Sequence, residues 1–176
     1  MSIVASEGSG REFAQVPPGL AQGVCYDIWD IGFQRGEYLG QPVVAHKIII
    51  GFEVDELVKD GEFEGKRMTL NKFYTLSLHK KAALRAELES WRGKPFTADE
   101  LEGFDVEKLI GANGMLNVVH SEKGKAKIAN ISPLMKNLAP MQPENKRTIP
   151  KWVQDYQEKS VKGADEPEAS GDGIPF

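Results

Sequence analysis

The sequence predicts a mainly β, α+β domain of the small-barrel type from three observations. Residues 66–78 alternate apolar and polar side chains, residues 79–92 change to a helical period, and two short strand-like runs follow at 115–120 and 125–131. Alternation is typical of a strand with one buried face, whereas apolar residues at i, i+4 and i+7 indicate one face of a helix. We therefore expect three strands, a helical insertion and two further strands.

The first two strands are expected at residues 23–33 and 43–54. The first run is rich in residues that favour strands, and the second contains three consecutive isoleucines at 48–50. A run this continuous indicates a strand that is not half exposed along its whole length. In the third strand, 66–78, the even positions are mainly apolar and the odd positions are polar, apart from Phe73.

The helical insertion has start and end signals of its own. Leu84, Leu88 and Trp91 recur at helical spacing, and Gly93 is the expected end of that helix. Residues 97–100 read Thr-Ala-Asp-Glu, which fits a capping box that begins a second, short helix. The helices therefore fall between the third and fourth strands.

Composition divides the chain into four segments. Residues 1–22 are rich in Ser, Gly and Pro and are expected to form a flexible N-terminal arm. Residues 23–134 form the folded domain, and 135–160 form a linker with a short helix. Residues 161–176 form an acidic tail that buries little apolar surface and is expected to be disordered.

The charge distribution limits the surfaces that the chain offers. The 176 residues carry a formal charge of −4 at pH 7, and the tail holds one lysine against four acidic residues. Residues 1–160 contain 21 basic and 22 acidic residues, so this body is close to neutral. Any nucleic-acid interface must therefore be a local patch.

Several chemistries find no support in the sequence. The single Cys25 has no partner for a disulfide or redox pair, and His46, His79 and His120 lack metal-ligand spacing. There is neither a phosphate-binding glycine-rich loop nor a Gly-x-Ser-x-Gly elbow. No apolar run approaches a membrane span, and the N-terminus lacks the regions of a signal peptide. We expect a cytoplasmic protein that is no enzyme and uses no cofactor, metal or membrane.

The tail carries the most specific motif. It ends in Asp172-Gly173-Ile174-Pro175-Phe176, after a stretch with three further acidic residues. This ending resembles the tail of bacterial and phage single-stranded DNA-binding proteins, in which an acidic run precedes Ile-Pro-Phe. The resemblance implies that the tail recruits replication, recombination and repair enzymes and does not itself grip DNA. A flexible acidic segment with an apolar end is expected to bind in an apolar pocket that is rimmed by basic residues. The expected docking residues are Asp172, Ile174, Pro175 and Phe176.

This tail departs from the family pattern in one respect. Asp172 stands alone next to the tip, between two glycines, where the family often has an acidic run. A single carboxylate gives less electrostatic attraction to basic residues than a run does.

The body of the chain resembles a family of phage replication-associated proteins that are expected to be single-strand binders. The resemblance covers 23–134 and rests on residues 74–84, 91–93, 104–105, 109–111 and 118–120. Together with the strand order and the tail, it implies a five-stranded oligonucleotide-binding (OB) fold barrel with a helical insertion between strands 3 and 4.

Sequence-tolerant binding of single strands needs cations along the phosphates and aromatic faces for unpaired bases. The candidate residues are Trp29, Phe33, Arg35, Tyr38, Lys47, Lys66, Arg67, Asn71, Lys72, Phe73, Lys125 and Lys127.

Phe73 is either a stacking ring or a residue covered by a helix or loop. Trp29, expected to share a face with Phe33, either stacks or packs in the core. Lys47 interrupts an apolar run and is expected to point to solvent. The lysines between strands four and five either clamp a backbone or stay solvated.

The short helix of the linker has three interpretations. Pro150 suits its first turn, and Trp152, Val153 and Tyr156 would then share one side. The segment docks on the barrel, binds DNA through its cations and Trp152, or forms a subunit contact; we favour docking.

The expected function is that of a protein that coats and protects single-stranded DNA in phage replication, recombination or repair. Its expected partners are single-stranded DNA and the enzymes that the tail recruits, and a homo-oligomer is compatible with the sequence. Two alternatives stay open. One is a recombination mediator or annealing protein, and the other is a protein-interaction module that binds no nucleic acid, which the near-neutral body favours.

Overall fold

The structure, a computed structural model, describes residues 14–161. It is mainly β, with one antiparallel sheet in the strand order β3-β2-β1-β4-β5. The strands are β1 (Gly19–Tyr38), β2 (Gln41–Leu57), β3 (Arg67–Thr75), β4 (Asn113–His120) and β5 (Ala126–Ser132). The helices are α1 (Ala83–Arg92), α2 (Ala98–Glu102), the 3₁₀ helix η1 (Val106–Leu109) and α3 (Lys151–Glu158). The predicted mainly β class with few helices is confirmed.

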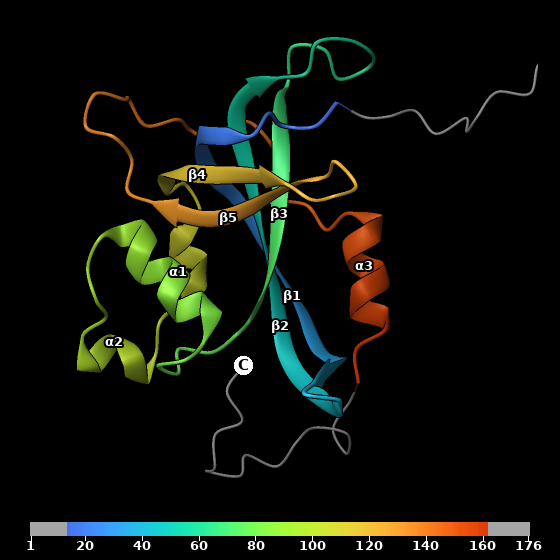
Figure 1. The fold of residues 1–176 in the computed structure, drawn as a ribbon, viewed down its shortest axis with the longest axis vertical. Helices are drawn as coiled ribbons and strands as arrows, with labels where there is room; N and C mark the ends of the chain where they lie inside the picture. The colour runs from blue at the N-terminus through green and yellow to red at the C-terminus, as the bar shows by residue number, and fades with distance from the viewer. Residues whose placement is uncertain (1–13, 162–176) are drawn as a thin grey trace, which may run out of the picture.

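The long strands β1 and β2 connect the two parts of the sheet. Residues 19–24 of β1 pair with β4, and residues 23–38 pair with β2. In Figure 1, β4 and β5 cross in front of the other strands, and the ends of β1 and β2 run beyond β3 as a two-stranded extension. We call this extension, residues 33–46, the arm.

A single-residue bulge at Ile31 interrupts the pairing of β1 with β2. A bulge places two residues of one strand opposite one residue of its partner, so the side chains beyond it change face. Trp29 pairs with Ile49, and Phe33 pairs with His46. Because Ile49 and His46 are an odd number of positions apart in an uninterrupted strand, they face opposite sides. The prediction that Trp29 and Phe33 share a face is therefore wrong.

The larger core lies between the sheet and α1. Leu84, Leu88 and Trp91 of α1 are buried, as their spacing predicted. The Trp91 ring lies 5.5 Å from the ring of Phe52, and its Nε1 donates a hydrogen bond to the backbone oxygen of Asn113 at 2.8 Å. Full burial of one such side chain stabilises the fold by about 1.5–3 kcal/mol. Helix α1 therefore covers one face of the sheet, which we call the inner face.

The predicted end of α1 and the predicted start of α2 are confirmed, whereas α1 begins at Ala83, four residues later than predicted. Gly93 ends α1 in the left-handed region, with φ of 72°, where an L side chain would be strained. Thr97 caps α2, and its side chain and that of Glu100 form the expected capping box.

The two edge strands β3 and β5 are joined by a side chain. Glu87 of α1 accepts a hydrogen bond from the backbone N–H of Ile131 on β5 at 2.7 Å. The same carboxylate accepts from the Tyr74 hydroxyl at 3.1 Å and from the Lys72 ammonium at 2.6 Å, both on β3. Within residues 14–161 no ladder pairs β3 with β5, so the hydrogen bonding does not show the predicted closed barrel.

Helix α3 covers part of the opposite face of the sheet (Figure 1). Its Val153 is fully buried against Trp29, Ile31 and Ile49. The interpretation that the linker helix docks on the domain is therefore confirmed.

The folded part begins earlier than predicted. β1 starts at Gly19, and Val16 is buried in the core, so residues 14–22 pack against the domain. This packing differs from the flexible N-terminal segment predicted for 1–22. The Ser-, Gly- and Pro-rich composition gave no sign of one core contact and of the start of a strand. Residues 1–13 of the predicted N-terminal segment and residues 162–176 of the predicted tail lie outside the described residues. Among the described helices, none is long and apolar enough to cross a membrane.

Replacing Glu87 tests its role between the two edges. Glu87→Gln should lower the free energy of unfolding by about 2–3 kcal/mol, because it removes a buried charge that pairs with Lys72 and accepts from Ile131. The control Glu89→Gln alters the part-exposed pair with Arg85 and should change stability by less than about 1 kcal/mol. Urea unfolding of both variants measures the difference, and equal stabilities would contradict the bridging role.

Candidate nucleic-acid interface

The candidate interface lies on the outer face of the sheet, which we define as the face that α3 covers in part. Trp29, Ile49 and Phe73 form one row across β1, β2 and β3. The next row toward the arm contains Lys47 and Thr75. Because residues two positions apart in a strand share a face, both rows lie on the same side. The outer face therefore combines aromatic and cationic side chains from different strands.

Phe73 is an exposed ring on this face. Its side chain is 45 % exposed, and its ring lies 5.2 Å from that of Tyr156 on α3 in an edge-to-face arrangement. Tyr156 is 37 % exposed, and the Lys159 ammonium lies 5.8 Å from its ring. Trp152, one turn earlier on α3, is exposed to the same extent. We call Phe73, Trp152 and Tyr156 the aromatic patch.

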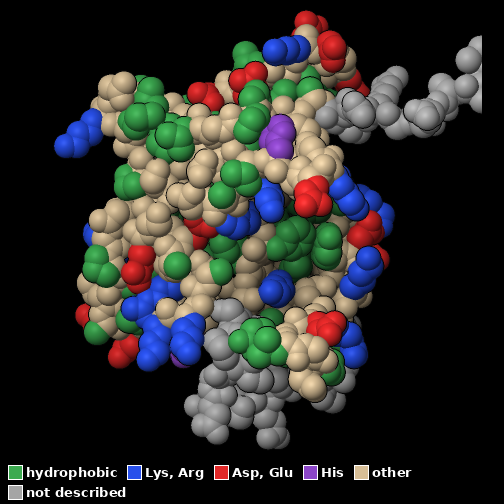
Figure 2. All heavy atoms as spheres, viewed as in Figure 1, with side chains coloured by type: hydrophobic (Ala, Val, Ile, Leu, Met, Phe, Trp, Pro, Cys, Tyr) green, Lys and Arg blue, Asp and Glu red, His purple; other side chains and the backbone are tan. Residues whose placement is uncertain are grey.

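The surroundings of the aromatic patch are visible in the space-filling view. Figure 2 shows apolar side chains gathered between β3 and α3, with Lys and Arg side chains around them. Proteins that bind single-stranded nucleic acid combine exposed rings, which stack on bases, with neighbouring cations, which attract phosphates.

Trp29 is not part of the exposed surface. It is only 3 % exposed, and the rings of Tyr26 and Trp152 lie against it with centroids at 5.8 and 5.5 Å. Its Nε1 donates a hydrogen bond to the backbone oxygen of Thr148 at 2.6 Å. Of the two alternatives for Trp29, the structure therefore shows core packing, because α3 covers the ring that the sequence offered for stacking.

Lys47 lies at the base of the arm, next to the cavity that Tyr38 of the arm lines. Both residues line this cavity, which has a volume of about 220 Å³. Lys47 is half-buried and donates a hydrogen bond to Thr75 Oγ1 at 2.7 Å, which differs from the prediction that it points to solvent. Burial lowers the pKa of Lys47. Gln34 connects this cavity to the aromatic patch, because its Nε2 donates to the backbone oxygen of Tyr156 at 2.8 Å.

Two of the predicted cations are held in ion pairs. Arg67 lies 3.1 Å from the buried carboxylate of Glu53, and Lys72 is paired with Glu87 on the inner side. These contacts are structural and compete with any phosphate. Of their neighbours, Asn71 is exposed on the outer face, and Lys66 lies over the ring of Phe63 at 5.7 Å.

The remaining predicted residues lie elsewhere. Phe33 stacks on His46 at 4.9 Å on the other face of the arm, and Arg35 follows on the same side. Lys125 and Lys127 are exposed on the β4–β5 hairpin, which is a separate element from the strands that carry the aromatic patch. The structure therefore brings together Tyr38, Lys47 and Phe73, and it separates them from Phe33 and Arg35.

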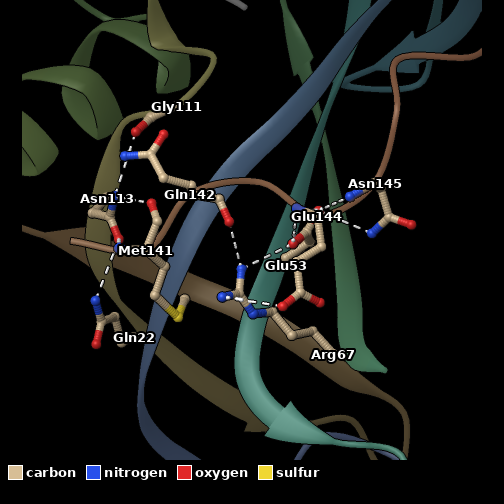
Figure 3. Close-up of polar contacts among 9 residues, drawn as sticks. All are labelled: Gln22, Glu53, Arg67, Gly111, Asn113, Met141, Gln142, Glu144 and Asn145. Atoms are coloured by element: carbon tan, nitrogen blue, oxygen red, sulfur yellow. Dashed lines mark hydrogen bonds and ion pairs between the residues drawn. The ribbon is translucent and has the colours of Figure 1, made fainter. Parts of the chain in front are cut away.

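The chain that leads into α3 is anchored by side chains of the sheet. We call residues 139–161 the strap. Figure 3 shows its first residues beside β1 and β4, where Asn113 Nδ2 donates to the backbone oxygen of Met141 at 2.9 Å. Gln22 Nε2 donates to the backbone oxygen of Ala139 at 2.7 Å. The strap therefore enters the outer face along a fixed path.

Glu53 is the central anchor of the strap. It is fully buried on β2, and its carboxylate accepts hydrogen bonds from the backbone N–H groups of Glu144 and Asn145, both at 2.9 Å (Figure 3). The side chains of Asn145 and Arg67 donate to it as well. Burial by itself raises the pKa of Glu53, but these hydrogen bonds outweigh it and hold the pKa below its ordinary value.

Asp27 forms the second acidic anchor. This buried side chain on β1 accepts hydrogen bonds from the Arg147 guanidinium and from the backbone N–H of Thr148, both at 3.1 Å. The last turn of α3 is attached to β1 by Gln157, whose Nε2 donates to the backbone oxygen of Asp30 at 2.9 Å. These contacts fix α3 beside β3 and so determine which rings are exposed.

Sequence reasoning missed the acidic anchors, and it offered DNA binding by the helix that is now α3 only as an alternative to docking. Asp27 and Glu53 are acidic residues inside largely apolar strand segments, which is a usable signal because a buried charge needs partners. Tyr156 and Lys159 gave no such signal, since their position beside Phe73 depends on where the strap runs.

No known protein family and no curated protein sequence matches this chain. Within the part of the chain that the structure describes, no group of three or more His, Cys, Asp or Glu side chains is placed to hold a metal ion.

The anchor at Glu53 makes stability depend on pH. Because its folded-state pKa lies below the ordinary value of 4.5, its stabilisation is full above pH 4.5 and is lost as the pH falls through the lower folded pKa. Glu53→Gln should lower the unfolding free energy at pH 7 by about 2 kcal/mol and reduce the further loss below pH 4.5. Urea unfolding from pH 7 to pH 2 measures this, with Glu62→Gln in the β2–β3 loop as control. A variant curve parallel to that of the unmodified protein would contradict the anchor role.

Proposed function

We propose that this protein binds single-stranded DNA across the aromatic patch and the arm cavity and keeps the strand unpaired and protected. The observation that carries the proposal is the exposed ring of Phe73 on an otherwise polar strand face, with the ring of Tyr156 beside it. Bases stack on such rings with about 1–3 kcal/mol each, whatever their sequence. Lys47 and Lys159 lie close enough to this surface to add charge.

The proposal includes an OB-type fold. Three features support it. Two of them are that α1, α2 and η1 stand between the third and fourth strands, and that β1 pairs with both β2 and β4. A third feature is Glu87, which holds β3 and β5 close together across the unpaired edges. In such folds the outer face of the second and third strands binds oligonucleotides, and Phe73 lies on that face.

The mechanism is stoichiometric. Rings of the patch stack on bases, and cations offset the phosphate charge, so binding should weaken as salt rises. The body is close to neutral, which keeps the number of phosphate contacts small. The proposed recruitment of replication and repair enzymes through Asp172, Ile174, Pro175 and Phe176 falls outside the described residues and remains a prediction from the resemblance.

A second candidate function is a module that binds an apolar protein segment. Its supporting observation is that Arg67 and Lys72, two of the cations nearest to Phe73 in sequence, are held in ion pairs. An exposed aromatic patch with few available cations suits a peptide as well as a nucleic acid.

A binding titration separates these functions. A fluorescent thymidine oligomer should bind the protein at low salt, and binding should weaken as salt rises. Phe73→Ala and Tyr156→Ala should each reduce affinity by about tenfold, because each removes one stacking surface. Phe63→Ala removes an exposed ring on the β2–β3 loop and should leave affinity unchanged. Absence of binding at low salt by the full chain would contradict the proposal and favour the protein-binding module.

A further inference from the structure

The cavity on the arm has the features of a site for one planar ring. It encloses about 220 Å³ on the outer face, beyond the row that contains Phe73. The residues that line it include Gln34, Glu37, Tyr38, Ala45, Lys47 and Thr75. Cavities that hold drug-sized ligands measure about 300 Å³ or more, so this one has room for a single base but not for a whole nucleotide.

Part of the cavity wall is apolar and aromatic. Val43 and Ala45 of β2 line it beside Tyr38 of β1, which is exposed. Such walls favour the flat face of a base and disfavour a phosphate, which would lose its hydration there. The sugar–phosphate backbone of a bound strand therefore stays outside the cavity.

Lys47 and Gln34 are placed to hydrogen-bond with the edge of a ring in the cavity, and Glu37 adds a carboxylate to the lining. The Lys47 ammonium has three donors, and one of them is directed to Thr75 Oγ1 at 2.7 Å. Gln34 directs its Nε2 to the backbone oxygens of Ile31 and Tyr156, so its Oε1 is the group that can accept. The cavity therefore presents a charged donor, fixed by Thr75, together with an acceptor.

This combination favours pyrimidines. Thymine and cytosine have one ring and carry keto oxygens, which accept charge-assisted hydrogen bonds from an ammonium group. Adenine carries no keto oxygen, and its exocyclic amine is a donor. Guanine also carries a keto oxygen, but its two fused rings fill more of the cavity than the single ring of a pyrimidine does.

We infer that the arm cavity is a subsite for one pyrimidine of the bound strand, packed against Tyr38 and held at a keto oxygen by Lys47. This inference rests on the proposed function, since it assumes that a single strand crosses the outer face. It adds a modest base preference to an otherwise sequence-tolerant surface. Thr75 is a positioning residue, because it acts by orienting the Lys47 ammonium.

The test compares thymidine, cytidine and deoxyadenosine oligomers of equal length in competition titrations. Homopolymers differ in their own base stacking, so the informative quantity is the change in the pyrimidine-to-adenine affinity ratio between the protein and its variants. Lys47→Met keeps most of the aliphatic side chain and removes the donor. Thr75→Val keeps the shape and the charge but removes the oxygen that orients Lys47. Lys59→Met, in the β2–β3 loop, controls for the loss of one positive charge.

We expect Lys47→Met to reduce the affinity for pyrimidine oligomers about tenfold, the effect of one charged hydrogen bond, and to lower the ratio. Thr75→Val should lower the ratio by a smaller factor, and Lys59→Met should leave it unchanged. If all oligomers bind but the ratio stays the same in every variant, the subsite is wrong and the proposed function stands. If no oligomer binds the unmodified protein, both the subsite and the proposed function fail.

Discussion

The buried carboxylate of Glu53 fixes the path of the strap, and the candidate interface depends on that path. A carboxylate without water is costly unless several donors surround it, and Glu53 receives them from two strap residues and from Arg67. Within residues 14–161, every buried side-chain nitrogen and oxygen atom has a hydrogen-bond partner. The anchor therefore acts as a specific attachment point, since few other arrangements of the strap could satisfy the same charge.

Helix α3 has two opposite effects on the outer face. It buries Trp29 and Ile49, which would otherwise leave a large apolar surface exposed on the sheet. It also brings Tyr156 next to Phe73, so that two rings from distant parts of the chain form one patch. The same docking thus removes one aromatic ring from the candidate site and contributes another.

Local patterns in the sequence predicted much of the fold and part of the site. The alternation in β3 predicted both its buried side and the anomalous ring of Phe73, because successive side chains of a strand point to opposite faces of the sheet. The spacing of Leu84, Leu88 and Trp91 predicted the face of α1 that packs on the sheet. Other features depend on contacts between distant segments, which local patterns do not record. The bulge at Ile31, which separates Trp29 from Phe33, is one of them, and the docking geometry of α3 is another.

The most direct test of the proposed interface is photo-crosslinking of the protein to a single-stranded oligomer with iodouracil in place of thymine, followed by mass spectrometry of the peptides. The outer-face account predicts crosslinks in peptides that contain Phe73 or Tyr156, and in the arm peptide that contains Tyr38. Crosslinks confined to the β4–β5 hairpin around Lys125 and Lys127 would contradict it and place the strand on a different surface.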